Sequence, residues 1–330
     1  MTLSEVGPVL LADLQAPVRD RLLHVEDELR RMIEADLPLI NDVNQHLLRM
    51  RGKMFRPTLV LLADEATGSV GESADTLAAV LELIHLATLV HDDSVDHSVL
   101  RRGMPTINAM FSHQVSVIMG DFLYSRAVVE LVRIGDLDAL RVIGRVTNDM
   151  TVGEMRQLLA HDPLAFSEAQ YDLLIRAKTA SLISGACEVG ALSAPPAERQ
   201  ALARFGDLMG RAFQITDDLL DYTADESTTG KPSGLDLREH KVTLPLIHAL
   251  PLLHPAERQQ VERLMADEAP QEGEIGAVIA AVTAAGGLDY ARERAQQLVL
   301  EAEAELDVLP ATPAREMLRA CLAYVLDRRR

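Results

Sequence analysis

The sequence predicts an all-α protein, and three observations support this fold class. Nearly every periodic segment places its apolar residues at helical spacing. The alternation of apolar and polar residues that marks a strand bounded by turns is hard to find. Helix start and stop signals fall at the ends of the periodic segments. We therefore expect long helices that bury their apolar faces against one another.

The expected helices follow from their apolar stripes and from the residues at their ends. One long stripe runs through Leu77, Val80, Leu81, Ile84, Ala87 and Thr88, and others cover 115–132 and 142–159. Gly135 and Asp136 end one helix and open the next, and Ser167 with Gln170 forms a capping box. Pro255 and Pro313 are typical first-turn prolines. The interior segment 224–241, with Gly230, Pro232 and Gly234, predicts a long loop of functional size.

Composition restricts the partners. The chain has 330 residues, 48% hydrophobic, and a formal net charge of -18, which excludes nucleic acid and anionic membrane surfaces as electrostatic partners. Its two cysteines have no metal-ligand spacing, and its N-terminus does not resemble a secretory signal, so we expect a cytoplasmic protein. No run reaches eighteen consecutive apolar residues, so we expect no transmembrane segment. The length alone suits one large domain or two ordinary domains.

A crowded acidic motif follows the first apolar stripe. The stretch LVHDDSVDHSVLRRG contains Asp92, Asp93 and Asp96. Carboxylates this close repel one another and resist desolvation, so a cation is expected beside them. The stretch FQITDDLLDY repeats the spacing with Asp217, Asp218 and Asp221, about 125 residues later. A single DDxxD also fits a solvated helix end, but two copies that each end an apolar stripe favour a shared site.

Helical geometry indicates which cation is bound. Asp92 and Asp96 lie about 40° apart on one helical face, with His85 between them two turns back. Asp217 and Asp221 repeat this arrangement, with Gln214 on the preceding turn. Oxygen-only ligands without a dedicated cage suit Mg²⁺ completed by substrate phosphates. An EF-hand is excluded because neither copy has the alternating acidic loop and closing Glu.

Basic residues accompany both motifs. Each fits a solvated surface charge on its own, but together in an acidic protein they indicate phosphate binding. Two diphosphates could be held, one through metal and one through cations alone. The candidates are Lys53, Arg56, Arg101, Arg102, Lys178, Lys231 and Lys241.

The sequence resembles the trans-polyprenyl diphosphate synthases, the chain-elongating isoprenyl diphosphate synthases, from about Arg51 to the C-terminus. RGKMFRP resembles the family's G-G-K-R-x-R-P element, and ELIHLATLVHDDSVDHSVLRRG resembles its first aspartate-rich region. AKTASL, FQITDDLLDY and GKPSGLDLREHKVTLP match later elements in the family's order. Terpene cyclases share the fold but usually carry N-D-x-x-S-x-x-x-E in place of the second DDxxD.

The resemblance implies a role for each matching position. Three Mg²⁺ with the allylic diphosphate would be bound by Asp92, Asp93, Asp96, Asp217, Asp218 and Asp221. Cations for that diphosphate would be Arg101, Lys178, Lys231 and Lys241. Isopentenyl diphosphate would be held by Lys53, Arg56, His85 and Arg102. Thr179 and Gln214 would lie along the reacting allylic tail, where their dipoles can stabilise positive charge, and Lys178 is grouped with them as catalytic.

Three positions depart from the family pattern. Arg51 and Met54 replace a Gly and an Arg of the first element, and His240 replaces a Gly before Lys241. The substrate-binding pair Lys53 and Arg56 is retained, so we expect activity to survive.

Product length should depend on the helix below the first aspartates. Thr88, Ile84 and Leu81 lie down successive turns of one face, with Ala87 nearby, and short-chain members of the family typically carry an aromatic at the first turn. Ala87 and Thr88 are small, and one helical turn of about 5.4 Å matches roughly one isoprene unit. The small residues also fit plain helix packing. The overall resemblance to bacterial octaprenyl and solanesyl-type synthases implies a C30 to C50 product for quinone side chains.

The resemblance thus implies an isoprenoid synthase fold over a single domain, 1–330, usually as a homodimer. Its substrates would be isopentenyl diphosphate and an allylic primer such as farnesyl or geranylgeranyl diphosphate. The alternatives are a geranylgeranyl diphosphate synthase, a class I terpene cyclase, a non-catalytic subunit of a heteromeric synthase and an isoprenoid-binding protein. A cyclase would leave Lys53 and Arg56 unexplained, a subunit would be expected to lose acids, and a binding protein would need no metal.

Overall fold

The computed structural model describes residues 9–50, 52–69, 71–158, 163–223 and 234–327. The described chain is almost entirely helical, as the apolar periodicity predicts. Its longer helices, of eight or more residues, are α2 (Arg19–Ile33), α3 (Pro38–Met50), α4 (Phe55–Ala66), α5 (Ala74–Val95), α7 (His113–Ile134), α8 (Leu137–Leu158), α9 (Glu168–Ile175), α10 (Ser181–Gly190), α11 (Pro196–Thr223), α15 (Pro255–Ala266), α16 (Glu272–Ala284), α17 (Gly287–Glu305) and α18 (Pro313–Leu326).

Short elements join the long helices. The short α-helices are α1 (Leu11–Gln15), α6 (Ile107–Met110), α13 (Leu235–Arg238) and α14 (Leu244–Ala249). The 3₁₀ turns are η1 (Ala16–Val18), η2 (Pro163–Ala165) and η4 (Leu306–Val308), and η3 (Arg176–Ala180) is a π-helical turn. Within the described residues, the sheet is limited to the antiparallel pair β1 (Leu100–Arg101) and β2 (Met104–Pro105).

The predicted helix ends are confirmed. Gly135 ends α7 with a left-handed φ of 74°, and the Asp136 carboxylate accepts the Asp138 N–H at 2.7 Å at the start of α8. The capping box of Ser167 is also present at the start of α9. The predicted loop 224–241 is wrong in part, because α13 lies within it. The segment 224–233, including Lys231, lies outside the described residues.

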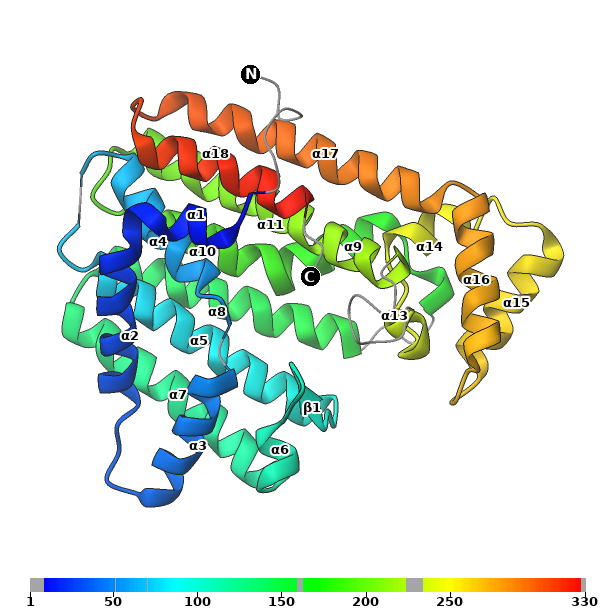
Figure 1. The fold of residues 1–330 in the computed structure, drawn as a ribbon, viewed down its shortest axis with the longest axis horizontal. Helices are drawn as coiled ribbons and strands as arrows, with labels where there is room; N and C mark the ends of the chain where they lie inside the picture. Colours follow the sequence, from blue (N-terminus) through cyan, green and yellow to red (C-terminus); the bar gives the residue numbers. More distant parts are fainter. Residues whose placement is uncertain (1–8, 51, 70, 159–162, 224–233, 328–330) are drawn as a thin grey trace.

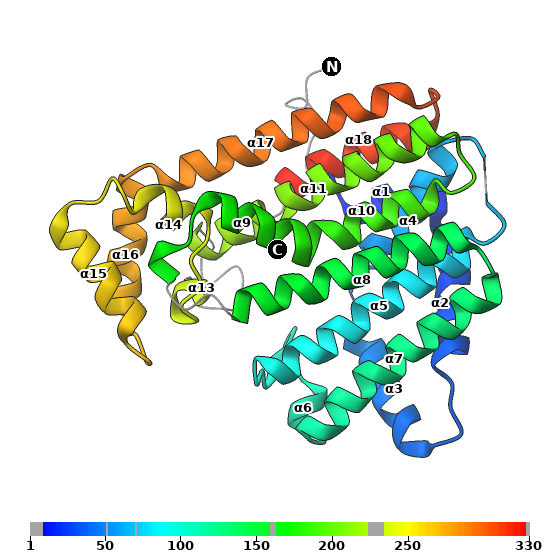
Figure 2. The ribbon, with the colours of Figure 1, turned by 180° about the vertical axis from the view of Figure 1, so that it is seen from behind.

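The long helices form a bundle with a polar end. α11 packs along α17, α5 packs along α7, and α10 lies between α4 and α11. Figure 1 and, from behind, Figure 2 show that α5, α8 and α11 all end on the same side of the bundle, where α13 and α14 lie. The helices α15 and α16 project beyond α13 and α14. Both acidic motifs therefore lie at this end.

The centre of the bundle is apolar. Leu81, Leu83 and Ile84 of α5 and Phe205 of α11 are fully buried, and each contributes about 1.5–3 kcal/mol by burial. α5 is long and apolar enough to span a membrane, as is the bent pair formed by α16 and the segment from α17 to Val308. However, 67% of the tested window of α5 is buried within the protein. α5 is therefore a core helix.

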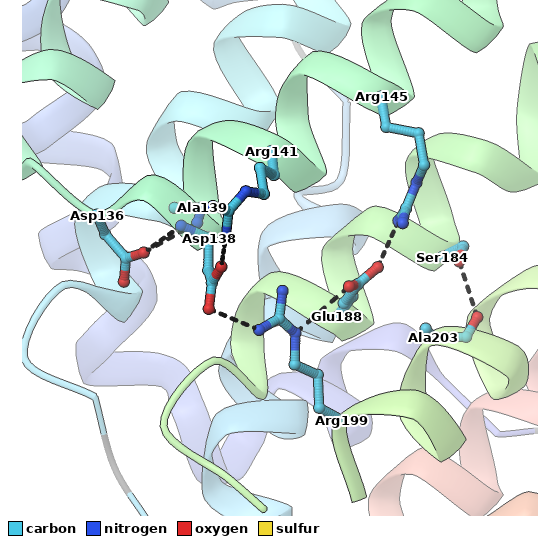
Figure 3. A network of polar contacts seen from close by, with 9 residues as sticks. All are labelled: Asp136, Asp138, Ala139, Arg141, Arg145, Ser184, Glu188, Arg199 and Ala203. Atoms are coloured by element: carbon cyan, nitrogen blue, oxygen red, sulfur yellow. Dashed lines mark hydrogen bonds and ion pairs between the residues drawn. The ribbon is translucent and has the colours of Figure 1, made fainter. Parts of the chain in front are cut away.

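A polar network ties three helices together away from the acidic motifs (Figure 3). Glu188 of α10 pairs with Arg145 of α8 and, at 3.3 Å, with Arg199 of α11. Arg199 also reaches Asp138 at the start of α8, at 3.2 Å. These residues line a cavity of about 940 Å³ to which the acidic motifs do not contribute. Their charges are largely paired with one another, so the network acts as a structural brace between α8, α10 and α11.

Candidate active site

The first acidic motif lies at the C-terminal end of α5. Asp93 is buried and accepts from the Arg101 guanidinium at 2.8 and 2.9 Å. Arg101 is positioned by the β1–β2 hairpin, whose two turn residues, Arg102 and Gly103, have φ of 52° and 75°. Asp96 follows the last residue of α5 and lines the cavity beside the acidic motifs. The negative charge of Asp93 is thus paired with the positive charge of Arg101.

Asp92 has a different environment. Burial, followed by the negative charges of Glu154 and Asp96, raises the pKa of Asp92 to about 6, and Lys178 and Arg101 only partly oppose this. The carboxylate therefore lies in an excess of negative potential. A bound cation would relieve that excess.

The second acidic motif lies near the end of α11. Asp217 is exposed, whereas Asp221 faces the following segment. The Asp221 carboxylate accepts the N–H groups of Leu235 and Asp236, both at 3.0 Å. Asp221 therefore fixes the start of α13 in addition to facing the site.

Asp218 is the centre of a buried hydrogen-bond network. The Tyr171 hydroxyl donates to one carboxylate oxygen at 2.5 Å, and Gln214 Nε2 donates to the other at 2.8 Å. The Gln214 carbonyl in turn accepts from the Thr179 hydroxyl at 2.8 Å. Burial and the charge of Asp236 raise the pKa of Asp218 well above its ordinary value, which the two hydrogen bonds oppose. The predicted pair Thr179 and Gln214 is thus brought into contact.

Lys178 and Thr179 lie on the π-helical turn η3, between α9 and α10. π-helical turns frequently occur at functional sites because they redirect side chains from a regular helix. Lys178 Nζ pairs with Glu154 at 2.6 Å and donates to Gln157 at 3.1 Å, both on α8. An incoming diphosphate would compete with Glu154 for this cation.

The basic residues around the start of α4 contact α5 and the β1–β2 hairpin. Arg56 Nη1 donates to His85 Nε2 at 2.9 Å, which makes that nitrogen an acceptor and the ring neutral. Burial, with the positive charges of Arg56, Arg102 and Arg101, keeps the pKa of His85 well below its ordinary value. Gly52 gives the Arg102 guanidinium room, since a Cβ there would lie 3.0 Å from Nη1. Lys53 is exposed.

The residues around the start of α4 are also held by aromatic packing and by a hydrogen bond from α1. Phe55 stacks on Phe213 of α11 with ring centroids 6.2 Å apart, and it packs against Tyr324 of α18 at 5.6 Å. The Gln15 amide of α1 donates to the Lys53 carbonyl at 2.7 Å. Met54 has a left-handed φ of 56° where the chain enters α4.

Each acidic motif contributes one aspartate, Asp96 and Asp218, to the wall of a cavity of about 590 Å³. The predicted residues on its wall are Asp96, Lys178, Thr179, Gln214, Asp218 and Lys241. Several residues on its wall had no predicted role, namely Gln157, Phe166, Tyr171, Leu174, Ile175, Asp236, Glu239, His240, Val242 and Thr243. Asp236 stands inside the quoted motif GLDLREHK, so its carboxylate could have been found there. Tyr171 has no comparable signal in the sequence.

The segment 235–241 forms one side of the cavity. Burial and the charge of Asp221 raise the pKa of Asp236 to about 7, which Lys241 opposes. Lys241 Nζ pairs with Glu239 at 2.6 Å. His240, which replaces a family glycine, has a left-handed φ of 56°.

The three predicted chain-length residues are not on the wall of this cavity. Ile84 and Ala87 are almost fully buried in α5, and the Thr88 hydroxyl donates to the His85 carbonyl at 2.8 Å. Their effect on product length stays a prediction.

The acids suit a metal that needs further ligands. Among the described residues, no group of three acidic, histidine or cysteine side chains is close enough to hold a metal ion by itself. One carboxylate of the α5 motif, Asp96, and one of α11, Asp218, line the cavity instead. Burial, followed by neighbouring negative charges, raises the pKa values of Asp92 and Asp236. Such a donor set fits a divalent ion whose coordination is completed by phosphate oxygens and water.

Comparison with known families gives one consistent result. The sequence model of the polyprenyl synthetase family matches residues 37–282. The octaprenyl diphosphate synthase of Escherichia coli (strain K12) is 39% identical over 288 residues, covering 87% of this chain and 89% of that protein. The all-trans-nonaprenyl-diphosphate synthase (geranyl-diphosphate specific) of Rhodobacter capsulatus is 38% identical over 318 residues, covering 96% and 97%.

A solved structure agrees over the whole chain. The polyprenyl synthase of Caulobacter crescentus, crystallised with calcium and isoprenyl diphosphate, superposes with a TM-score of 0.92 at 34% identity, covering 98% of this chain and 100% of that one. That protein therefore binds a divalent cation and a diphosphate within the same fold.

Proposed function

The chain belongs to the polyprenyl synthetase family, and we infer that it is a trans-prenyltransferase that joins isopentenyl diphosphate to an allylic diphosphate. The observation that carries this inference is the pair of DDxxD motifs at the ends of α5 and α11, each of which places one aspartate, Asp96 or Asp218, on the wall of one cavity beside Lys178 and Lys241. The family depends on a divalent metal, and we propose three Mg²⁺ per site.

The residues divide into three groups by position. Asp92, Asp96, Asp217 and Asp221 would hold the metal ions, while Asp93 and Asp218 complete the predicted set and are held in place by Arg101 and by Tyr171 with Gln214. The allylic diphosphate would be bound by Lys178, Lys241 and Arg101, together with Lys231, which lies outside the described residues. Lys53, Arg56, His85 and Arg102 would bind isopentenyl diphosphate through cationic and hydrogen-bond contacts.

The metal ions would neutralise the leaving diphosphate of the allylic substrate when bound. Lys178 and Lys241 would contact the same oxygens, and the Thr179 and Gln214 dipoles would face the allylic carbon where positive charge develops. The bond between that carbon and the diphosphate oxygen would break, and the alkene of isopentenyl diphosphate, whose diphosphate Arg56 and Arg102 would hold, would form the new carbon–carbon bond there. A proton would then pass to the released diphosphate, and the product would be an allylic diphosphate longer by one C5 unit. No protein nucleophile is required.

We propose a product of C30 to C50 for quinone side chains, because Ala87 and Thr88 put no aromatic below Asp92 and because the relatives named above make octaprenyl and nonaprenyl products. Farnesyl or geranylgeranyl diphosphate would be the primer. The alternative of a geranylgeranyl diphosphate synthase shares every feature except this length.

We also propose that the whole chain, 1–330, is one domain that works in the cytoplasm as a homodimer. Apolar side chains on the outer faces of α7 and α8 support the dimer, since Ile118, Val129, Val132 and Leu137 are all more than half exposed. Both acidic motifs are intact, which disfavours a non-catalytic subunit.

The test is product analysis with labelled isopentenyl diphosphate and farnesyl diphosphate, with and without Mg²⁺. We expect a Mg²⁺-dependent ladder that ends beyond C20. No elongation by intact protein with farnesyl, geranyl or geranylgeranyl primers would overturn the proposal. Release of diphosphate from the primer alone would instead identify a cyclase.

A further inference from the structure

His240 links the cavity wall to a neighbouring helical hairpin. Its backbone φ of 56° lies in the left-handed region, which a side chain disfavours and glycine tolerates. Its Nε2 lies 2.8 Å from the Asp267 carbonyl oxygen, so the imidazole donates this hydrogen bond. Asp267 begins the connection between α15 and α16. The side chain thus makes a contact that glycine could not make.

Two further contacts join the same segment to the hairpin. Arg238 Nη1 donates to the Pro270 carbonyl at 3.3 Å, and Nη2 pairs with Glu272 at the start of α16. Gly234 lies directly against α16, since a Cβ there would approach Ile275 Cγ2 to 2.4 Å. The segment 234–241 is therefore held on its outer side at three points.

The inner side of this segment carries the groups that face the cavity. Asp236, Glu239 and Lys241 line it, and so does His240, whose ring nitrogen reaches outward to Asp267. The Asp236 N–H donates to the Asp221 carboxylate at 3.0 Å, and the Lys241 N–H donates to the Asp236 carbonyl at 2.8 Å. A shift of the outer contacts would therefore disturb both Asp221, a predicted metal ligand, and Lys241, a predicted diphosphate ligand.

We propose that His240 is a positioning residue, whose hydrogen bond to the Asp267 carbonyl holds Asp236 and Lys241 against the diphosphate site. The α15–α16 hairpin then acts as the external support of the cavity wall. The catalytic consequence rests on the proposed prenyltransferase function, whereas the structural link to the hairpin does not.

The experiment compares two variants with the wild-type protein. His240→Gly removes the imidazole and relieves the left-handed backbone, while His240→Asn removes its reach but keeps a residue that tolerates this backbone. His24→Asn is the matched control, because the His24 side chain is 72% exposed on the distant helix α2. Backbone hydrogen exchange over 234–243 and 264–272 is measured in the intact proteins, without and with Mg²⁺ and inorganic diphosphate. Elongation kinetics are measured separately for each substrate.

We expect exchange of the Asp236 and Lys241 amides to rise about five- to tenfold in both His240 variants, corresponding to the loss of one hydrogen bond. Mg²⁺ with diphosphate should protect these amides less than in the wild type. The KM for the allylic substrate should rise several-fold, with a smaller change in kcat and in the KM for isopentenyl diphosphate. His24→Asn should match the wild type.

Unchanged exchange in both His240 variants would overturn the proposal. The proposal would also be overturned if His240→Gly were more stable than the wild type and had an unchanged KM for the allylic substrate. In that case the only effect of His240 would be the strain of its left-handed backbone. If the wild-type protein does not elongate any primer, the proposed function fails while the exchange measurements still decide whether His240 supports the wall.

Discussion

The Tyr171 hydroxyl and the Asp218 carboxylate, on α9 and α11, form a buried 2.5 Å hydrogen bond. It orients an aspartate of the second acidic motif from a helix that carries none of the motif itself. Because Gln214 holds the other oxygen, the carboxylate has one defined orientation at the cavity wall.

Tyr171→Phe should loosen this arrangement without removing an acid. We expect the free energy of unfolding to fall by about 1–3 kcal/mol, since a buried acceptor loses its donor. The Mg²⁺ concentration for half-maximal elongation should rise about tenfold, because Asp218 belongs to the predicted metal-binding motif and would lose its fixed orientation. Magnesium titrations at saturating substrate measure this. Tyr124→Phe, at an exposed position of α7, is the control, and equal magnesium curves for the two variants would contradict the prediction.

Stability should depend on pH in the direction opposite to ordinary carboxylates. The pKa values of Asp92 and Asp236 are about 6 and about 7 in the folded protein, above the value of about 3.9 in an unfolded chain. At these two sites the folded state therefore binds more protons than the unfolded state between pH 4 and 7, so their contribution to stability falls as pH rises. Metal binding needs the ionised acids and should strengthen over the same range.

Melting temperatures from pH 5 to 8, with and without Mg²⁺ and inorganic diphosphate, measure both effects. The melting temperature alone should decrease with pH, while the increase on adding Mg²⁺ and diphosphate should grow. Asp92→Asn with Asp236→Asn should flatten both trends. The double variant keeps the opposite contribution of His85, whose pKa is lowered, so the difference between the two proteins isolates the two acids. A wild-type melting temperature that climbs relative to the double variant through this range would show that the assigned pKa directions are wrong.

Gly52→Ala should weaken one substrate selectively. The new Cβ would lie 3.0 and 3.1 Å from the two terminal nitrogens of Arg102, so the guanidinium must move. We expect the KM for isopentenyl diphosphate to rise about tenfold and the KM for the allylic substrate to stay unchanged. Gly144→Ala on α8 is the control, since its Cβ meets nothing within 4 Å and should stabilise the helix by about 0.5–1 kcal/mol. Equal changes in both KM values would argue against this division of the site.

Thr88→Phe should shorten the product by at least one C5 unit, because an aromatic ring would then stand one turn before Asp92. Product ladders separated by length measure the change. Thr88→Val preserves the volume while removing the hydroxyl that donates to His85, so it should leave the product length unchanged. A full-length ladder from an active Thr88→Phe enzyme would place the growing chain elsewhere.

Glu188→Gln should affect stability and leave elongation nearly unchanged. The variant removes the charge between Arg145 and Arg199, and we expect a loss of about 1–3 kcal/mol in the free energy of unfolding. Chemical denaturation measures this loss. Asp289→Asn breaks an exposed pair with Arg292 and should cost less than about 0.5 kcal/mol. Equal costs for the two variants would mean that the Glu188 network is no better than a surface pair.

The sequence reveals what depends on local spacing. Helical periodicity predicts α5, α7 and α8, the pair Gly135 and Asp136 predicts the junction between α7 and α8, and the repeated DDxxD identifies both acidic faces. The π-helical turn at Lys178 is not predicted, because it arises where α9 meets α10 and leaves no periodic signal. The β1–β2 hairpin is missed because its strands have only two residues each. The contacts of Asp218 with Tyr171 and of Arg56 with His85 join distant segments, which spacing alone cannot pair.

The direction of the helices has an electrostatic consequence. α5 and α11 both end at the cavity, so the negative poles of two helix dipoles, about half a charge each, add to the carboxylates there. A diphosphate anion arriving alone meets a repulsive field, whatever its hydrocarbon tail. Substrate binding therefore requires neutralisation of the diphosphate charge first. The affinity for the substrate should depend on the concentration of divalent cation rather than on the length of the prenyl chain.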